Sequence, residues 1–300
     1  AYEISLGLVG SEMCIRDSTK SATEGINLVA QTFYEKFMQK GDEVILSLIE
    51  HHSNLIPWFF LRDKYGVVLK FANIQPSGEI DIDHFESLFT NKTKIVSLTH
   101  LSNVFGTKLN EKAISISKDK KVPILLDGCQ SAAHLKIDVQ ELGCDFFVFS
   151  GHKTYGPKGI GALYVSRKPR VRLEALIHGG GHERGFRSGT LPTHQIVGMG
   201  EAFRIAADEM DKDNKKIAKL ADLFWKEVSG IEEIYLNGSF KNKIPNITNI
   251  SFAYIEGESL IMALKDVAVS SGSACTSASL EPSYVLRALG RADELAHSSI

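Results

Sequence analysis

Apolar positions in the first half of the chain alternate between helical spacing and short continuous runs. A helix is predicted over residues 24–39, where apolar side chains recur every three or four positions. Runs with the length of buried strands cover residues 43–49, 67–74, 94–101, 123–126, 146–149 and 160–165. Because helical segments separate these runs, the pattern predicts an α/β fold on a largely parallel sheet that is covered on both faces. Ligands bind at the carboxyl ends of such strands, so the residues after each run are candidate site residues.

The pattern changes near residue 195. A long polar helix is predicted over about 195–228, and shorter elements follow: strands at 246–252 and 267–270, and helices at 259–265 and 282–289. We therefore expect a large domain over residues 19–195 and a smaller C-terminal α/β domain over 196–300. Residues 1–18 fit neither pattern and are expected to be a non-native segment.

Composition narrows the class of protein. The formal net charge of −2 gives no field for nucleic acid or an anionic membrane, and no run of about 18 apolar residues predicts a membrane helix. The cysteines, at positions 14, 129, 144 and 275, have no zinc-ligand spacing, so no metal site is predicted. Unpaired cysteines favour a reducing compartment, and we expect a cytoplasmic protein.

Lys153 lies in the segment Ser-Gly-His-Lys (150–153), directly after an apolar run. A lysine at the mouth of a buried strand can lose its proton and act as a nucleophile, as a Schiff-base lysine must. Ser150 and His152 could donate hydrogen bonds to a phosphate from the same turn. Taken alone, the segment is more typical of a strand-end turn with a solvated lysine.

Other strand ends carry candidate ligands for a planar, phosphorylated cofactor. Asp127 could keep a pyridine nitrogen protonated, and Gln130 could reach the ring's phenolic oxygen, although an Asp there could also cap a helix. Ala22 and Thr23 lie at the start of the first helix. Backbone N–H groups there could bind an anion, or the two residues could simply begin the helix without a ligand. His51 could stack on a ring and carry protons.

Cys275 lies in a small, polar, glycine-containing stretch, residues 270–279. Such a stretch is expected to be an exposed loop in which a cysteine has nothing to pack against. Cys275 is therefore a candidate nucleophile rather than a packing residue, with an incidental surface thiol as the alternative. Cys129 and Cys144 lie beside apolar strands and are expected to pack.

Taken together, the motifs resemble those of the pyridoxal-phosphate (PLP) cysteine desulfurases, of the fold-type I class. The matching segments occur in the family's order: Ala-Thr-Glu-Gly (22–25), Glu-His-His (50–52), His-Leu-Ser-Asn-Val-Phe-Gly (100–106), Asp-Gly-Cys-Gln (127–130), Ser-Gly-His-Lys-Thr-Tyr-Gly-Pro-Lys-Gly (150–159), Arg-Ser-Gly-Thr (187–190) and Ser-Gly-Ser-Ala-Cys-Thr (272–276). The resemblance covers nearly all of residues 20–300.

The resemblance implies a role for each candidate residue. Lys153 would hold PLP as a Schiff base, and His51 would stack on its ring. The other ring and phosphate ligands would be Ala22, Thr23, Asn103, Asp127, Gln130, Ser150 and His152. Thr190 would reach the phosphate of the partner subunit, which implies a homodimer. Cys275 would take sulfur from L-cysteine as a persulfide, which an iron–sulfur scaffold or sulfur-carrier protein collects; contact of the persulfide with a cluster would be transient.

The same resemblance marks departures. The large domain, residues 19–195, would be the PLP-binding domain without the family's first segment. The small domain, 196–300, stops before the arginine that would bind the substrate carboxylate. A chain without that arginine should bind cysteine poorly. Residues 20–150 resemble the Suf-type branch and 156–300 the Isc-type branch. The alternatives are therefore a selenocysteine lyase or other fold-type I enzyme, or an inactive chimeric fragment.

Overall fold

The computed structural model describes residues 15–166, 173–185, 187–271 and 281–300. The strands are β1 (Ile15–Thr19), β2 (Glu43–Ser47), β3 (Val68–Ala72), β4 (Thr93–Thr99), β5 (Ile124–Asp127), β6 (Phe146–Ser150), β7 (Gly161–Val165), β8 (Ile234–Leu236) and β9 (Ile250–Phe252). The helices are α2 (Ala22–Phe37), α3 (Ile56–Tyr65), α4 (Ile82–Ser87), α5 (Lys112–Asp119), α6 (Ser131–His134), α7 (Val139–Leu142), α8 (Thr193–Val228), α9 (Gly257–Ala263), α10 (Tyr284–Ala288) and α11 (Asp293–His297). Short 3-10 turns are η1 (His52–Asn54), η2 (Gly151–Thr154) and η3 (Glu183–Gly185).

Seven strands form the central sheet in the order β1-β7-β6-β5-β4-β2-β3. Strands β3, β2, β4, β5 and β6 run parallel, whereas β7 is antiparallel to both β6 and β1. Each of the six predicted strand runs overlaps one of β2 to β7. The predicted α/β fold with a largely parallel sheet is confirmed.

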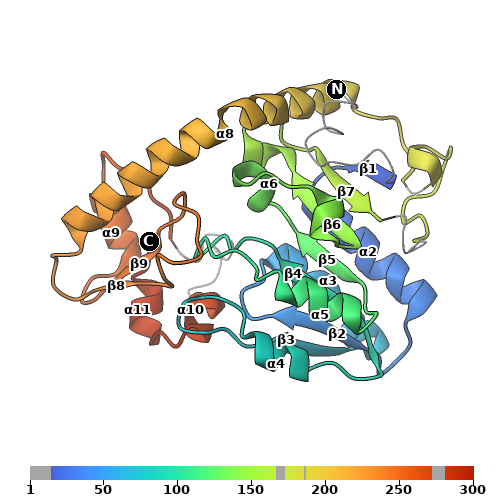
Figure 1. Ribbon diagram of the computed structural model, residues 1–300, viewed down its shortest axis with the longest axis horizontal. Helices are drawn as coiled ribbons and strands as arrows, with labels where there is room; N and C mark the ends of the chain where they lie inside the picture. Colours follow the sequence, from blue (N-terminus) through green and yellow to red (C-terminus); the bar gives the residue numbers. More distant parts are fainter. Residues whose placement is uncertain (1–14, 167–172, 186, 272–280) are drawn as a thin grey trace.

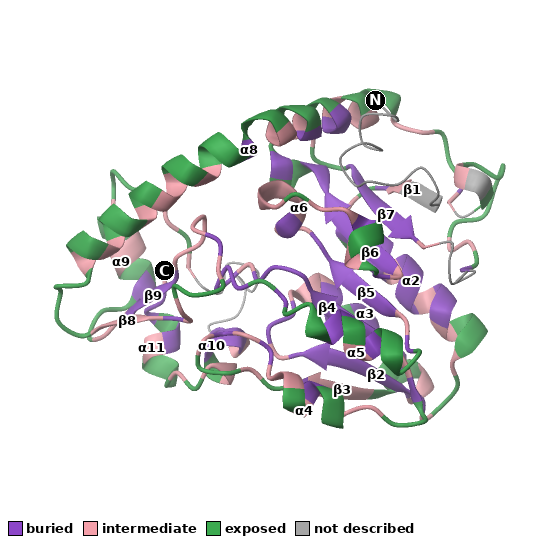
Figure 2. Cartoon of the chain, in the orientation of Figure 1, coloured by how far each residue is buried: buried purple, intermediate pink, exposed green. Residues whose placement is uncertain are grey.

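Both faces of the sheet are buried, as parallel strands require. Successive side chains of a strand point to opposite faces, so Leu125 and Leu126 enter two different cores. On one face α2 and α3 contribute Ile26 and Trp58, and on the other α4 contributes Phe85. Figure 2 shows β2, β4, β5, β6 and β7 as the buried part of the central sheet. Burial on both faces explains why the strands appear in the sequence as continuous apolar runs.

Helix α8 is one continuous helix of 36 residues that runs from the sheet to a smaller unit (Figure 1). Its first half packs on the sheet through Met199 and Phe203. The predicted domain boundary at residue 195 falls inside this helix, so the two parts of the chain share an element rather than a flexible linker. No described helix, α8 included, is long and apolar enough to cross a membrane.

The smaller unit contains a two-stranded sheet, β8 and β9, with α9 and α11 beside it (Figure 1). Here the sequence interpretation was partly wrong: residues 267–270 form no strand, the strand expected over 246–252 is only β9, and β8 was not predicted. The free edge of β9 is occupied by the end of the chain, because Ile250 and Ile300 exchange backbone hydrogen bonds of 2.9 Å.

Strand β1 begins at Ile15 and pairs with β7 along its whole length. Residues 15–18, part of the segment predicted to be non-native, thus complete one edge of the central sheet. Residues 1–14 lie outside the described residues, and the prediction about the segment's origin stays a prediction.

Candidate active site

A cavity of about 640 Å³ opens at the carboxyl ends of β4, β5 and β6 and beside the start of α2. Its volume is in the range of small-molecule and cofactor sites, about 300–1,000 Å³. Among its lining residues are nine that the sequence singled out: Ala22, Thr23, His51, Asn103, Asp127, Gln130, Ser150, His152 and Lys153. Thr190 is exposed and does not line this cavity, and Cys275 lies outside the described residues.

Lys153 lies in the turn η2, which follows β6 without a break. The turn is fixed at its base because the Gly151 N–H donates to the Ile160 carbonyl on the approach to β7, at 2.9 Å. Ser150 joins it to α2, since its Oγ accepts a hydrogen bond of 2.9 Å from the Ala22 N–H. The lysine turn and the first turn of α2 therefore form one wall of the cavity.

Asp127 ends β5 and is only 4% exposed. Burial raises the pKa of its carboxyl, although its Oδ1 accepts a 3.0 Å bond from the Cys129 N–H and the positive charges of His51 and Lys153 act in the opposite direction. Within the described part of the chain no lysine or arginine forms an ion pair with it. A buried carboxylate of this kind would be stabilised by a cationic ligand in the cavity.

Gly128, directly after Asp127, lies where the backbone comes very close to the core. A Cβ at residue 128 would lie 2.0 Å from Cζ of Phe147, the fully buried ring beneath it. A side chain at position 128 would clash with this ring, so glycine allows the end of β5 to lie directly against the core.

His51 caps the turn η1 and lines the cavity. Its Nδ1 accepts a hydrogen bond of 3.1 Å from the Ser53 N–H, so the neutral ring carries its proton on Nε2. Burial lowers the pKa of His51, and the charges of His52 and Lys153 lower it further, whereas Asp127 raises it. His51, Asp127 and Lys153 thus form one electrostatic unit.

Glu50 is a buried acid next to His51 that sequence reasoning did not single out. It is completely buried, and desolvation raises its pKa to about 8. The Ser47 hydroxyl and the Asn54 amide, at 2.7 Å for the latter, both donate to its carboxyl group. This network fixes the segment that carries His51; its sequence signal was an acid directly before two histidines at a strand end.

Cys129 and Tyr284 also line the cavity and were missed as site residues. Cys129 was expected to pack; it does contact the core, but its Sγ also lies 3.8 Å from Ser150 Oγ. Burial raises the pKa of its thiol well above the usual value, which disfavours a thiolate. The Tyr284 hydroxyl donates to the Glu50 carbonyl, and its ring meets His52 edge-on at 5.2 Å.

The chain before and after Cys275 reaches the same cavity. Ser270 and Ser271, at the start of the stretch, line it, and so do Glu281, Pro282 and Ser283, which follow the stretch. Across the described ranges no group of three or more histidine, cysteine, aspartate or glutamate side chains is arranged to hold a metal ion.

Comparison with known proteins agrees with this geometry. Residues 18–293 match the family model described as Aminotransferase class-V. The chain is 54% identical over 283 residues to proteins named Cysteine desulfurase IscS from Pseudomonas putida (strain W619) and, at the same level, from Pseudomonas savastanoi pv. phaseolicola. The alignment covers 94% of this chain and 70% of each relative, and it includes both halves of the chain.

Solved structures with the same fold have related descriptions. A structure described as a NifS-like protein superposes with a TM-score of 0.89 at 28% identity, covering 99% of this chain and 79% of that one. One described as SspA in complex with cysteine has a TM-score of 0.84 at 29% identity, covering 99% of this chain and 83% of its own. The chain therefore belongs to the class-V aminotransferase family and, within it, to the cysteine desulfurases.

Proposed function

We propose that this chain is a PLP-dependent cysteine desulfurase that converts L-cysteine to L-alanine and holds the sulfur as a persulfide on Cys275. The observation that carries the proposal is the single cavity shared by Lys153, Asp127 and His51, into which both flanks of the Cys275 stretch also project. Relatives at 54% identity are named as cysteine desulfurases, which supports the same activity.

The residues present suit PLP at both ends. Asp127 is a buried carboxylate in need of a cationic partner, and a protonated pyridine nitrogen is such a partner. At the other end Thr23 lies in the first turn of a 16-residue helix, where backbone N–H groups and the helix dipole attract phosphate. Lys153, Ser150 and His152 line the same cavity from the end of β6 and the turn η2 that follows it.

PLP, when bound, supplies the electron sink that lets a substrate lose its α-proton. Lys153 would hold the cofactor covalently and carry protons at Nζ, and Asp127 would accept the ring N–H. His51, Asn103 and Gln130 would surround the ring.

In the transfer step the Cys275 thiolate attacks the substrate sulfur. An S–S bond forms as the substrate C–S bond breaks, and the carbon gains a proton to give alanine. L-cysteine and one thiol thus become L-alanine and one persulfide, and no external oxidant is needed.

We also propose that the protein works as a cytoplasmic homodimer. Thr190 is exposed beside the glycine-rich stretch 179–189, where a hydroxyl could reach a partner's cavity. The acceptor of the persulfide sulfur would be an iron–sulfur scaffold or a sulfur-carrier protein.

The test is the visible absorption of the purified chain with added PLP, before and after L-cysteine, together with alanine formation. A yellow band that shifts with cysteine is expected, and Lys153→Ala should abolish it while the exposed Lys158→Ala, five residues along, should not. Cys275→Ser should keep the band and make no alanine. An unchanged band in Lys153→Ala would contradict the assignment. Faster turnover of selenocysteine than of cysteine would indicate a selenocysteine lyase instead.

A further inference from the structure

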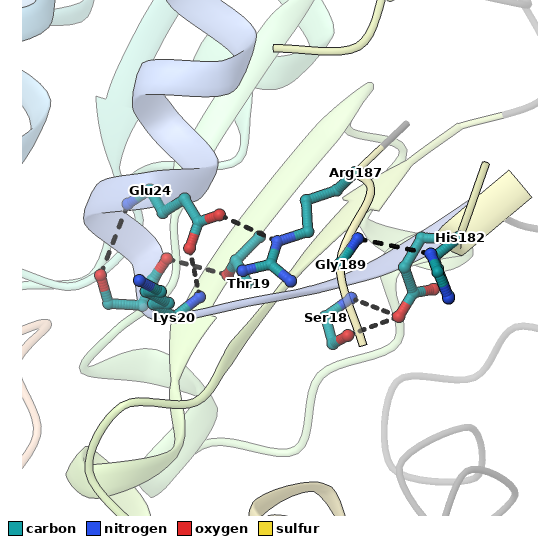
Figure 3. A network of polar contacts seen from close by, with 9 residues as sticks. Ser18, Thr19, Lys20, Glu24, His182, Arg187 and Gly189 are labelled. Atoms are coloured by element: carbon teal, nitrogen blue, oxygen red, sulfur yellow. Dashed lines mark hydrogen bonds and ion pairs between the residues drawn. The ribbon is translucent and has the colours of Figure 1, made fainter. Parts of the chain in front are cut away.

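Arg187 and Glu24 form an ion pair between two distant parts of the chain (Figure 3). Arg187 Nε donates to Glu24 Oε1 at 3.2 Å, and the two side chains are only 12% and 15% exposed. The described ion pairs on the surface of α8, such as that of Arg204 with Glu201, are by contrast about half exposed. Shielding from water makes the Arg187–Glu24 pair much less subject to screening by salt.

Glu24 closes the first turn of α2. Its second oxygen accepts a hydrogen bond from the Lys20 N–H, and its own N–H donates to Ser21 Oγ at 3.4 Å. This reciprocal arrangement is close to a capping box, which fixes the entry of the chain into a helix. Thr23 lies between Ser21 and Glu24, so the geometry of the proposed phosphate site depends on how this turn is held.

Arg187 belongs to a stretch, residues 177–189, that is held together by its own hydrogen bonds. The Ser188 N–H donates to the Ile177 carbonyl at 3.0 Å, and the Gly189 N–H donates to His182 Nδ1 at 3.4 Å. A second link to the start of the chain comes from the Ser18 N–H, which donates to the Glu183 carboxylate at 3.3 Å (Figure 3). The stretch is therefore attached to β1 and α2 at two points.

Charge gives the pair a specific task. A lone carboxylate in the first turn of α2 would occupy the positive end of the helix dipole and repel a phosphate bound there. Arg187 neutralises Glu24 while leaving its hydrogen bonds to the turn in place.

We infer that Glu24 and Arg187 are a positioning pair for the phosphate end of the cofactor site, and that they also fix the stretch that leads to Thr190. The inference rests on the proposed PLP dependence of the chain. Neither residue lines the cavity, so both act through Thr23 and its turn.

The experiment measures the dissociation constants of PLP and of pyridoxal, which lacks the phosphate, by absorption titration of the full chain. Arg187→Ala should weaken PLP binding about tenfold and leave pyridoxal binding unchanged, because the loss of an ionic hydrogen bond is of that size. Arg187→Lys should restore most of the affinity. The double variant Glu24→Gln/Arg187→Ala should bind PLP more tightly than Arg187→Ala alone, because the unneutralised carboxylate is gone.

Arg204→Ala is the matched control, since it removes an arginine with two exposed carboxylate partners on α8, and it should change neither affinity. Equal weakening of PLP and pyridoxal in Arg187→Ala would reduce the pair to a general structural role and overturn the inference. So would unchanged PLP binding in both Arg187 variants. A wild-type chain that binds neither compound would instead refute the proposed function.

Discussion

The two ends of the cavity are built in different ways. At the end of the cavity where we propose that the cofactor ring binds, Asp127 is buried, and desolvation raises the pKa of its carboxyl group, as it does for the buried Glu50 next to His51. At the end where we propose that the phosphate binds, Thr23 and His152 are exposed, and the first turn of α2 is held by hydrogen bonds and the Arg187–Glu24 pair. Burial thus tunes proton affinity at one end, while dipoles and paired charges prepare the other for an anion.

This difference between the two ends predicts that substitutions at them have different effects. Substitutions at the ring end should change chemistry and pH dependence, whereas substitutions at the phosphate end should change cofactor affinity.

Replacing Asp127 should have the largest effect. Asp127→Ala removes the buried carboxylate that we propose keeps a pyridine nitrogen protonated, and we expect turnover of L-cysteine to fall about 100-fold or more. Asp145→Asn is the control. Asp145 is another mostly buried aspartate whose pKa is raised by desolvation, and it lies just before β6, at the end of that strand away from Lys153. Steady-state kinetics would show the effect; equal losses in the two variants would mean that buried aspartates matter here only for folding.

Replacing Glu50 should change how stability depends on pH. The pKa of Glu50 is raised from 4.5 to about 8 in the folded chain, so the folded state holds a proton that the unfolded state releases. Its contribution is complete below pH 4.5 and is lost as the pH rises through about 8. From about pH 6 to about pH 8 the free energy of unfolding should fall by roughly 2 kcal/mol, at about 1.4 kcal/mol per pH unit.

Glu50→Gln should remove that slope, because an amide does not titrate. Urea denaturation at several pH values measures it. Asn54 can still donate to the amide oxygen, and the Ser47 hydroxyl can turn round and accept from the amide nitrogen. A variant that keeps the wild-type slope would show that another group sets it.

Replacing Thr23 tests the phosphate end. Thr23→Val removes one hydroxyl from an exposed position, so we expect a normal fold and PLP affinity lower by about tenfold. Gln31→Ala, further along α2, serves as the control. The affinity of the wild type for PLP should also decrease with added salt. Unchanged PLP affinity in Thr23→Val would show that the phosphate binds elsewhere.

Replacing Tyr284 should have the smallest effect. Tyr284→Phe removes the hydrogen bond to the Glu50 carbonyl but keeps the ring against His52. The free energy of unfolding should fall by about 1 kcal/mol. Differential scanning calorimetry measures the change. Tyr254→Phe, at a side chain that is 94% exposed, should have no effect in that measurement. Equal melting temperatures for all three proteins would mean that this contact contributes nothing.

Much of the sheet and of the candidate site could be predicted because the information is local. The strands β2 to β7 fall on continuous apolar runs, and the candidate residues Asp127 and Lys153 lie at the end of β5 and three residues after β6. Adjacent parallel strands place such residues side by side without any knowledge of long-range contacts.

What could not be predicted depends on contacts between distant segments. Tyr284 reaches Glu50 from 234 positions away, and Arg187 reaches Glu24 from 163. The pKa of Glu50 follows from complete burial, which no local pattern reveals. Residues 267–270 were wrongly assigned to a strand, and the pairing of Ile300 with Ile250 beside β9 could not be read from local sequence either.

The contact between Gly128 and Phe147 has a consequence for engineering. With the ring 2.0 Å from where a Cβ would stand, position 128 tolerates no side chain while Phe147 is present. A saturation library at residue 128 alone should yield only the parent among its folded members. To reshape the floor of this cavity, a designer would have to vary residues 128 and 147 as one unit, starting from a smaller residue at 147.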